Sequence, residues 1–285
     1  MKHFLIASIW LVLLSLTSGE GSAQQLNMGK APVIDVYPFF NASFIKNKKV
    51  RFIETEVMLK VPNQKIRYSN RVQKFEFDRS GNVMVYQNIS PSGVNSKTSY
   101  FLNKTGLLAI IHSEMPHKDA LLSFFYDEKG RVVTKETANG KNPEALVEEK
   151  FTYEDFSATQ FKKYYLNDEN LTYKHEVVDL DSKGRVVESR ARYIRGVNRE
   201  YSKFGYAQKL LVSVSINVKN VTRREEKYVM SYDDNEVLQF MQFRIDGAPI
   251  YRYEYLYEDE LIIAILRKDL KSEEIQITKL KYRFF

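Results

Sequence analysis

The chain has 285 residues, a formal net charge of +7 and no cysteine. The lack of cysteine excludes disulfide bonds and a lipid anchor attached to cysteine, so a stable fold must depend on the size of its core. Acidic and basic residues are interspersed along the chain. This argues against a nucleic-acid-binding protein, which gathers positive charge on one face.

Residues 1–23 are predicted to form a cleavable signal peptide. A basic start at Lys2 precedes an apolar run from Phe4 to Leu16, and the small residues Gly21 to Ala23 precede the expected cleavage. The alternative, a membrane anchor, needs about 20 apolar residues, and this run is shorter. We therefore expect an exported protein in the periplasm, at the periphery of the outer membrane or outside the cell, with no transmembrane helix after signal removal.

Residues 24–285 are predicted to form a single β domain. Its first part, residues 24–70, lacks any repeat and is expected to supply atypical capping strands. Residues 71–260 carry a repeated unit, and residues 261–285 are expected to add C-terminal strands. The clearest copies of the unit are Phe77–Val83 (FDRSGNV), Tyr126–Val132 (YDEKGRV) and Leu180–Val186 (LDSKGRV).

Each copy of the unit predicts a tight hairpin turn. An Asp side chain opens the turn by bonding backbone amides ahead of it, and Gly then supplies the positive φ that the turn requires. The turn-forming residues are Asp78, Gly81, Asp127, Gly130, Asp181 and Gly184. A second turn signal, such as Asp246-Gly247, lies between copies. Two turns per unit mean two strands per unit, which predicts an antiparallel meander.

The segment from Tyr251 to Glu258 shows the strand pattern most clearly. Tyrosines alternate with mostly charged residues, which is the period of a β-strand with one aromatic face. We identify Tyr251, Tyr253, Tyr255 and Tyr257 as a candidate binding stripe. Either this stripe faces the core, or it is an exposed platform that stacks on sugar rings or a partner chain. The predicted fold is all-β, a meander of tandem hairpins forming an extended curved sheet, open or partly closed.

The copies at Tyr126–Val132 and Leu180–Val186 resemble the core of YD repeats, the Tyr-Asp-x-x-Gly-Arg units of rearrangement-hotspot and teneurin-type shells. In that family the repeats pair into a spiralling sheet that encloses a toxin or acts in adhesion. The resemblance covers residues 71–260, where the other copies are degenerate. The chain is also similar to short exported proteins of Bacteroidetes-type bacteria. It is too short for such a shell, so the resemblance implies the architecture and no functional residue.

The chain offers few residues for catalysis or metal binding. Its four histidines include His112 and His117, five residues apart, without the further ligands that a zinc site needs. Asp179–Gly184 begins like a calcium loop but places Lys183 at a ligand position. The paired carboxylates of Asp233-Asp234 and Glu258–Glu260 lie at expected hairpin tips, where water prevents the environment that glycosidase carboxylates require. We expect no catalytic, cofactor-binding or metal-binding residues.

We therefore predict a non-enzymatic binding or structural protein of the bacterial envelope or cell surface. Its partner is expected to be an envelope glycan, a lipid or a protein, and not a nucleic acid. Two alternatives stay open: a lipid-carrier-like or outer-membrane β-barrel protein, and a hydrolase with an unrecognised site. A membrane barrel requires an uncharged outward face on every strand, whereas the charged run at 223–227 supplies both faces of a predicted strand.

Overall fold

The structure, a computed structural model, describes residues 40–116, 118–139, 142–196, 199–219 and 223–285. The expected signal peptide and residues 24–39 lie outside the described residues. One short helix, α1 (Ala42–Asn47), precedes the strands in the described part. The strands are β1 (Val50–Lys60), β2 (Arg67–Phe77), β3 (Val83–Ser90), β4 (Gly93–Leu102), β5 (Leu108–Met115), β6 (Lys118–Tyr126), β7 (Val132–Asn139), β8 (Asn142–Ser157), β9 (Gln160–Leu166), β10 (Thr172–Leu180), β11 (Val186–Tyr193), β12 (Arg199–Ala207), β13 (Leu210–Lys219), β14 (Arg223–Tyr232), β15 (Leu238–Ile245), β16 (Ala248–Glu258), β17 (Leu261–Asp269) and β18 (Ile275–Phe284).

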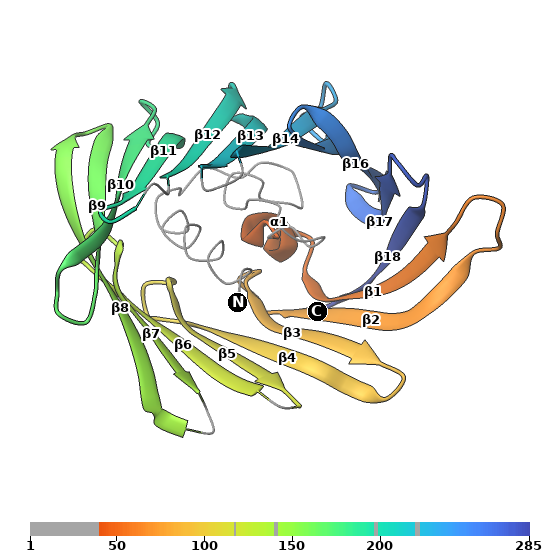
Figure 1. The fold of residues 1–285 in the computed structure, drawn as a ribbon. Coiled ribbons are helices and arrows are strands. Elements are labelled where there is room, and N and C mark those ends of the chain that lie inside the picture. Colours follow the sequence, from red (N-terminus) through yellow and green to blue (C-terminus); the bar gives the residue numbers. More distant parts are fainter. Residues whose placement is uncertain (1–39, 117, 140–141, 197–198, 220–222) are drawn as a thin grey trace.

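All 18 strands belong to one antiparallel sheet that closes on itself. Each strand pairs with the next one in the chain, and β1 pairs with both β2 and β18. The result is a ring of strands around a central space in which α1 lies (Figure 1). The predicted all-β antiparallel meander is confirmed, and the sheet is a closed barrel. Closure leaves no unpaired edge strand, which removes the usual site of edge-to-edge aggregation.

The register of the strands separates an inward face from an outward face. Ile53 on β1 lies opposite Phe75 on β2, Phe75 opposite Tyr86, and Tyr86 opposite Thr98. The ring of Phe40 contacts Phe75 at a centroid distance of 5.1 Å, which places this row on the side of α1. Because side chains alternate along a strand, the residues between these positions face outward.

The Asp-x-x-Gly turns gather at one end of the barrel, here called the turn end. In the turn after β6, the carboxylate of Asp127 accepts hydrogen bonds from the amides of Lys129 and Arg131 at 3.0 and 2.8 Å. The same bonds form at Asp78 and Asp181. Gly81, Gly130 and Gly184 have φ values of 85°, 75° and 76°. The predicted turn chemistry is therefore confirmed.

Helix α1 packs inside the barrel near the turn end. Asn41 caps it by accepting hydrogen bonds from the amides of Ser43 and Phe44, while Phe44 and Ile45 are buried in the main core. The β2–β3 turn touches the helix backbone so closely that a Cβ on Gly81 would lie 1.9 Å from the carbonyl oxygen of Ala42. Residues 24–70 were expected to form capping strands. The described part of that range contains α1, β1 and the start of β2.

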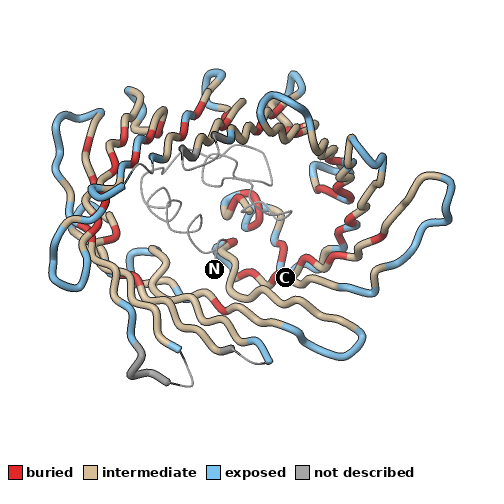
Figure 2. The backbone as a smooth tube through the Cα atoms, viewed as in Figure 1, coloured by how far each residue is buried: buried red, intermediate tan, exposed pale blue. Residues whose placement is uncertain are grey.

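Burial is highest around α1 and lowest at the hairpin tips (Figure 2). The main core contains α1 together with inward side chains of β1, β2 and β9–β18, and a smaller cluster surrounds Phe124 and Phe151. Inward residues of β3 and β5 are only half-buried. The inward face is thus packed on one side of the ring and accessible on the other.

Candidate binding site on the inward face of the barrel

The tyrosine stripe of β16 lies on the inward face. Tyr253 pairs with inward Met241, and Tyr255 is 4% exposed within the main core. Tyr251 and Tyr257 are half-buried, and Tyr251 stacks on Phe243 with ring centroids 6.1 Å apart. A core role is confirmed for Tyr255. A binding role for the remaining tyrosines stays a prediction.

A second set of tyrosines links neighbouring hairpins at the turn end. In each case the hydroxyl near the end of one strand donates a hydrogen bond of 2.5–3.1 Å to a carbonyl oxygen near the start of the preceding strand. The pairs are Tyr126–Leu108, Tyr153–Val132, Tyr206–Val186, Tyr232–Leu211, Tyr257–Leu238 and Tyr282–Ile262. Burial raises the pKa of Tyr126 and of Tyr206 to about 12, so both remain donors at neutral pH. Each of these tyrosines therefore ties the end of its strand to the strand before it.

Charged side chains form a buried cluster on the inward face of β9–β11. Lys163 is 1% exposed, and its Nζ lies 3.8 Å from the ring centroid of Phe151 and 4.5 Å from that of Tyr165. The hydroxyl of Tyr165 donates to Glu176 Oε2 at 2.7 Å, and Ser189 donates to the other oxygen of Glu176. Desolvation lowers the pKa of Lys163 to about 7, although the nearby Glu176 opposes the shift. Burial and Glu176 both raise the pKa of Tyr165.

Two ion pairs extend this cluster along the inward face. Lys174 and Glu200 form a nearly buried pair, with Nζ 2.7 Å from Oε2. Lys135 pairs with Glu149 at 3.1 Å. The ammonium of Lys174 also lies 5.1 Å from the ring centroid of Tyr193. These contacts create a polar belt inside an otherwise apolar and aromatic surface.

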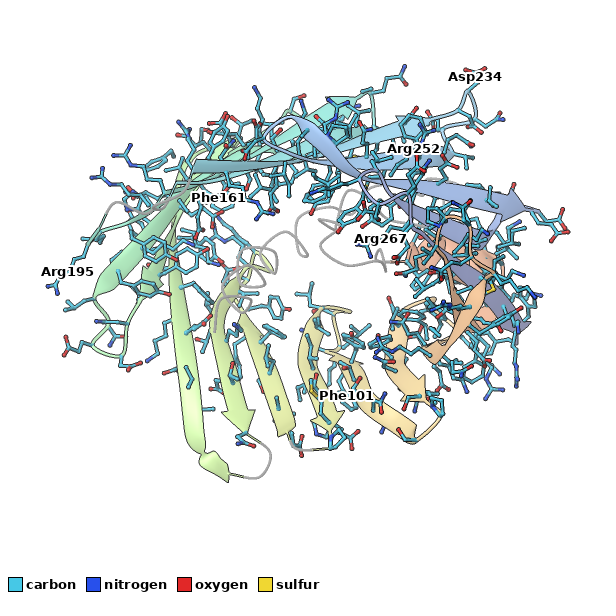
Figure 3. The ribbon with its side chains drawn as sticks, turned by 45° about the vertical axis from the view of Figure 1, so that its right-hand side comes forward. Phe101, Phe161, Arg195, Asp234, Arg252 and Arg267 are labelled. Atoms are coloured by element: carbon cyan, nitrogen blue, oxygen red, sulfur yellow. The ribbon has the colours of Figure 1, made fainter. Side chains whose placement is uncertain are left out.

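Several other inward side chains are not fully buried. Val147 is 61% exposed and Tyr173 is 39% exposed, although both belong to the inward face by register or ring contacts. Arg267 points toward the interior of the ring (Figure 3), with its guanidinium 4.0 Å from the ring centroid of Tyr251. Its Nε is buried and has no hydrogen-bond partner among the described residues. The inward face therefore offers accessible apolar area and aromatic rings.

The outward face is charged along much of the barrel. Cross-strand and same-strand ion pairs lie there at distances of 2.8–3.3 Å between nitrogen and oxygen. They are Lys97–Glu114, Lys150–Glu148, Arg190–Glu188, Arg252–Glu254 and Lys281–Glu56. Apolar residues such as Phe101 and Phe125 are exposed between them near the turn end. An uninterrupted apolar band of the kind that contacts lipid is absent from these described strands.

The residues considered for catalysis or metal binding are engaged in structural contacts. His112 Nε2 lies 2.7 Å from Asp119 Oδ1, whereas His117 lies outside the described residues. Asp181 and Asp233 accept hydrogen bonds from backbone amides of their own turns. In the described ranges, no three His, Asp or Glu side chains are placed to hold a metal ion. No helix of the described chain is long and apolar enough to cross a membrane.

The buried charged cluster was not predicted from the sequence. A signal was present, because Lys163 lies two residues from both Phe161 and Tyr165 and must share their face of the strand. The same argument applies to Glu176 between Lys174 and Val178.

No family model matches the chain, and no curated protein was found to be related to it. Among solved structures, a porin-like protein from Bacteroides uniformis has a TM-score of 0.41 at 7% identity, covering 83% of this chain and 97% of that one. A porin-like protein from Bacteroides vulgatus has a TM-score of 0.39 at 12% identity, covering 80% and 97%. The Tc holotoxin pore of Photorhabdus luminescens has a TM-score of 0.31 at 9% identity, covering 76% of this chain and 14% of that one. These scores are too low to transfer a function.

Proposed function

We propose that the protein is an exported, non-enzymatic binding protein that holds an amphipathic ligand, a lipid, inside its barrel. The observation that carries this proposal is the distribution of side chains across the sheet. Apart from the polar belt, the inward face is mostly apolar and aromatic, whereas ion pairs of charged residues cover much of the outward face. A barrel with this distribution shields apolar surface in its interior and presents water with charges.

The inward face offers contacts for both the apolar and the polar part of such a ligand. Half-buried residues such as Tyr86 and Ile111 offer contact area for an acyl chain. The pairs Lys174–Glu200 and Lys135–Glu149 supply polar groups that orient a headgroup. Small-molecule sites combine these features, with mostly apolar walls and a few placed polar groups.

The same distribution argues against an outer-membrane barrel. Moving an outward Lys or Arg to the middle of a bilayer costs about 2–4 kcal/mol each. Outward cations occur on many strands, including Arg190 on β11, Arg252 on β16 and Lys281 on β18. A structural or adhesive platform would bind its partner on the outward face. That function gives the buried inward charges no role.

Two adjacent isoleucines of β5 provide a matched test. Ile111 pairs with inward Leu122, and Ile110 pairs with outward Ser123. Both are half-buried, so replacement of either by Glu introduces the same charge on opposite faces. The protein is purified without detergent, and binding of the fluorescent probe N-phenyl-1-naphthylamine is titrated and competed with phospholipid.

We expect Ile111→Glu to weaken probe binding by about tenfold or more, because a charge must be desolvated against the probe. Ile110→Glu is expected to leave binding unchanged. Far-UV circular dichroism confirms that both variants remain folded. The proposal is wrong if the wild-type protein binds no probe, or if Ile110→Glu is the damaging change and the wild-type protein requires detergent.

A further inference from the structure

The outward face of β8–β13 contains a hollow whose positive charge is not balanced. The hollow has a volume of about 810 Å³, within the range of small-molecule sites. Its outward lining includes Phe156, His175, Arg190, Arg192, Arg199 and Tyr201. It lies on the face opposite to the proposed lipid site, so it is independent of that function.

Two arginines in this hollow face each other directly across neighbouring strands. Arg192 on β11 pairs in register with Arg199 on β12, and His175 on β10 lies opposite Arg192 from the other side. Like charges directly opposite each other in an antiparallel pair destabilise a sheet. Adjacent strands are about 4.8 Å apart, so the three side chains can reach one common point.

The carboxylates near this row are committed elsewhere. Glu200, which also lines the hollow, pairs with Lys174 of the inward face at 2.7 Å. Arg190, which also lines the hollow, forms ion pairs with Asp179 at 2.7 Å and with Glu188 at 3.2 Å. Arg192 and Arg199 form no ion pair with any described residue. Burial lowers the pKa of His175, and the positive charges of Lys162 and Arg192 lower it further. The local potential is therefore positive where the two arginines meet.

We propose that this hollow binds a phosphate group, either that of a free phosphorylated sugar or that of a lipid headgroup. Arg192, Arg199 and His175 approach from three strands, which matches the three terminal oxygens of a tetrahedral phosphate better than a planar carboxylate. Arg binds such oxygens through paired, charge-assisted hydrogen bonds. The exposed ring of Phe156 and the ring of Tyr201 provide faces for the sugar.

The test compares two double variants that remove the same charge. Arg192→Gln with Arg199→Gln removes the facing pair, and Lys279→Gln with Arg283→Gln removes two exposed cations on the outward face of β18. Binding of glucose 6-phosphate is measured by isothermal titration calorimetry, with glucose as the neutral control. Co-sedimentation with vesicles of phosphatidylcholine and phosphatidylglycerol is measured in parallel.

We expect the wild-type protein to bind glucose 6-phosphate and not glucose. The Arg192/Arg199 variant is expected to bind it about tenfold more weakly, which corresponds to about 1.4 kcal/mol, and the β18 variant to bind as the wild type. Vesicle binding that depends on the arginine pair, without binding of the free sugar phosphate, supports the proposal and assigns the phosphate to a lipid headgroup. The proposal is overturned if the wild type binds neither probe, or if both double variants behave alike.

Discussion

The contact between α1 and the β2–β3 turn can be tested with one pair of glycine substitutions. Gly81 and Gly184 have similar φ values, 85° and 76°, so alanine meets the same backbone strain at both positions. This strain costs about 1–2 kcal/mol. A Cβ on Gly184 would have no heavy atom within 4 Å, whereas one on Gly81 would lie 1.9 Å from the carbonyl oxygen of Ala42 and 2.9 Å from the amide of Lys46.

Gly81→Ala must therefore displace α1, and Gly184→Ala must not. Burying a large apolar side chain contributes about 1.5–3 kcal/mol, so complete loss of Phe44 and Ile45 from the core costs about 3–6 kcal/mol. We expect Gly81→Ala to lower the free energy of unfolding by at least about 2 kcal/mol more than Gly184→Ala, because a partial shift of the helix loses part of this burial. Urea unfolding followed by far-UV circular dichroism measures both. Equal losses of stability in the two variants would show that α1 does not pack against this turn.

Two further predictions concern the inward face. Lys163→Met is expected to remove a pH dependence of stability. The pKa of Lys163 is about 7 in the folded state and near 10.5 in the unfolded state, so the unfolded state binds more protons between these values. Wild-type stability therefore rises with pH in this window, by up to about 1.4 kcal/mol per pH unit. Urea unfolding from pH 7 to 9.5 measures this slope, and an unchanged slope in the variant would contradict the burial of a neutral amine. Tyr232→Phe removes the hydroxyl bonded to the carbonyl of Leu211 at 2.7 Å and is expected to cost about 1 kcal/mol. Tyr164→Phe is its control, because Tyr164 bonds the exposed Glu154, and an equal loss there would remove the special role of the turn-end tyrosines.

Local features of the fold were predictable because their causes are local. The turns at Asp127 and Asp181 depend on a side chain bonding amides two and four residues ahead, so the motif itself specifies them. The alternation from Tyr251 to Glu258 likewise predicts β16 and its aromatic face, but not whether that face points inward. The turn at Asp233 forms although glycine is lost, since Glu236 adopts a φ of 63° in its place.

Closure of the sheet and the burial of the inward charges could not be predicted from local sequence patterns. The pairing of β1 with β18 joins residues more than two hundred positions apart, and their alternation is equally compatible with an open sheet. Helix α1 is six residues long, too short to show a periodic pattern, and its packing against Gly81 stabilises it. Lys163 is tolerated inside because the rings of Phe151 and Tyr165 surround it, and one of these rings comes from another strand.

The position of bound lipid tests the account most directly. The chain lacks cysteine, so single cysteines can be placed at Ser113, which pairs with inward Thr98, and at Ser123, which pairs with outward Ile110. Each is labelled with bimane, and the quenching of its fluorescence by a phospholipid with brominated acyl chains is measured in detergent-free solution. Quenching at position 113 and not at position 123 is predicted, because the acyl chains lie inside the barrel. Quenching at position 123 alone, seen only after reconstitution into bilayers, would show instead that lipid surrounds the barrel.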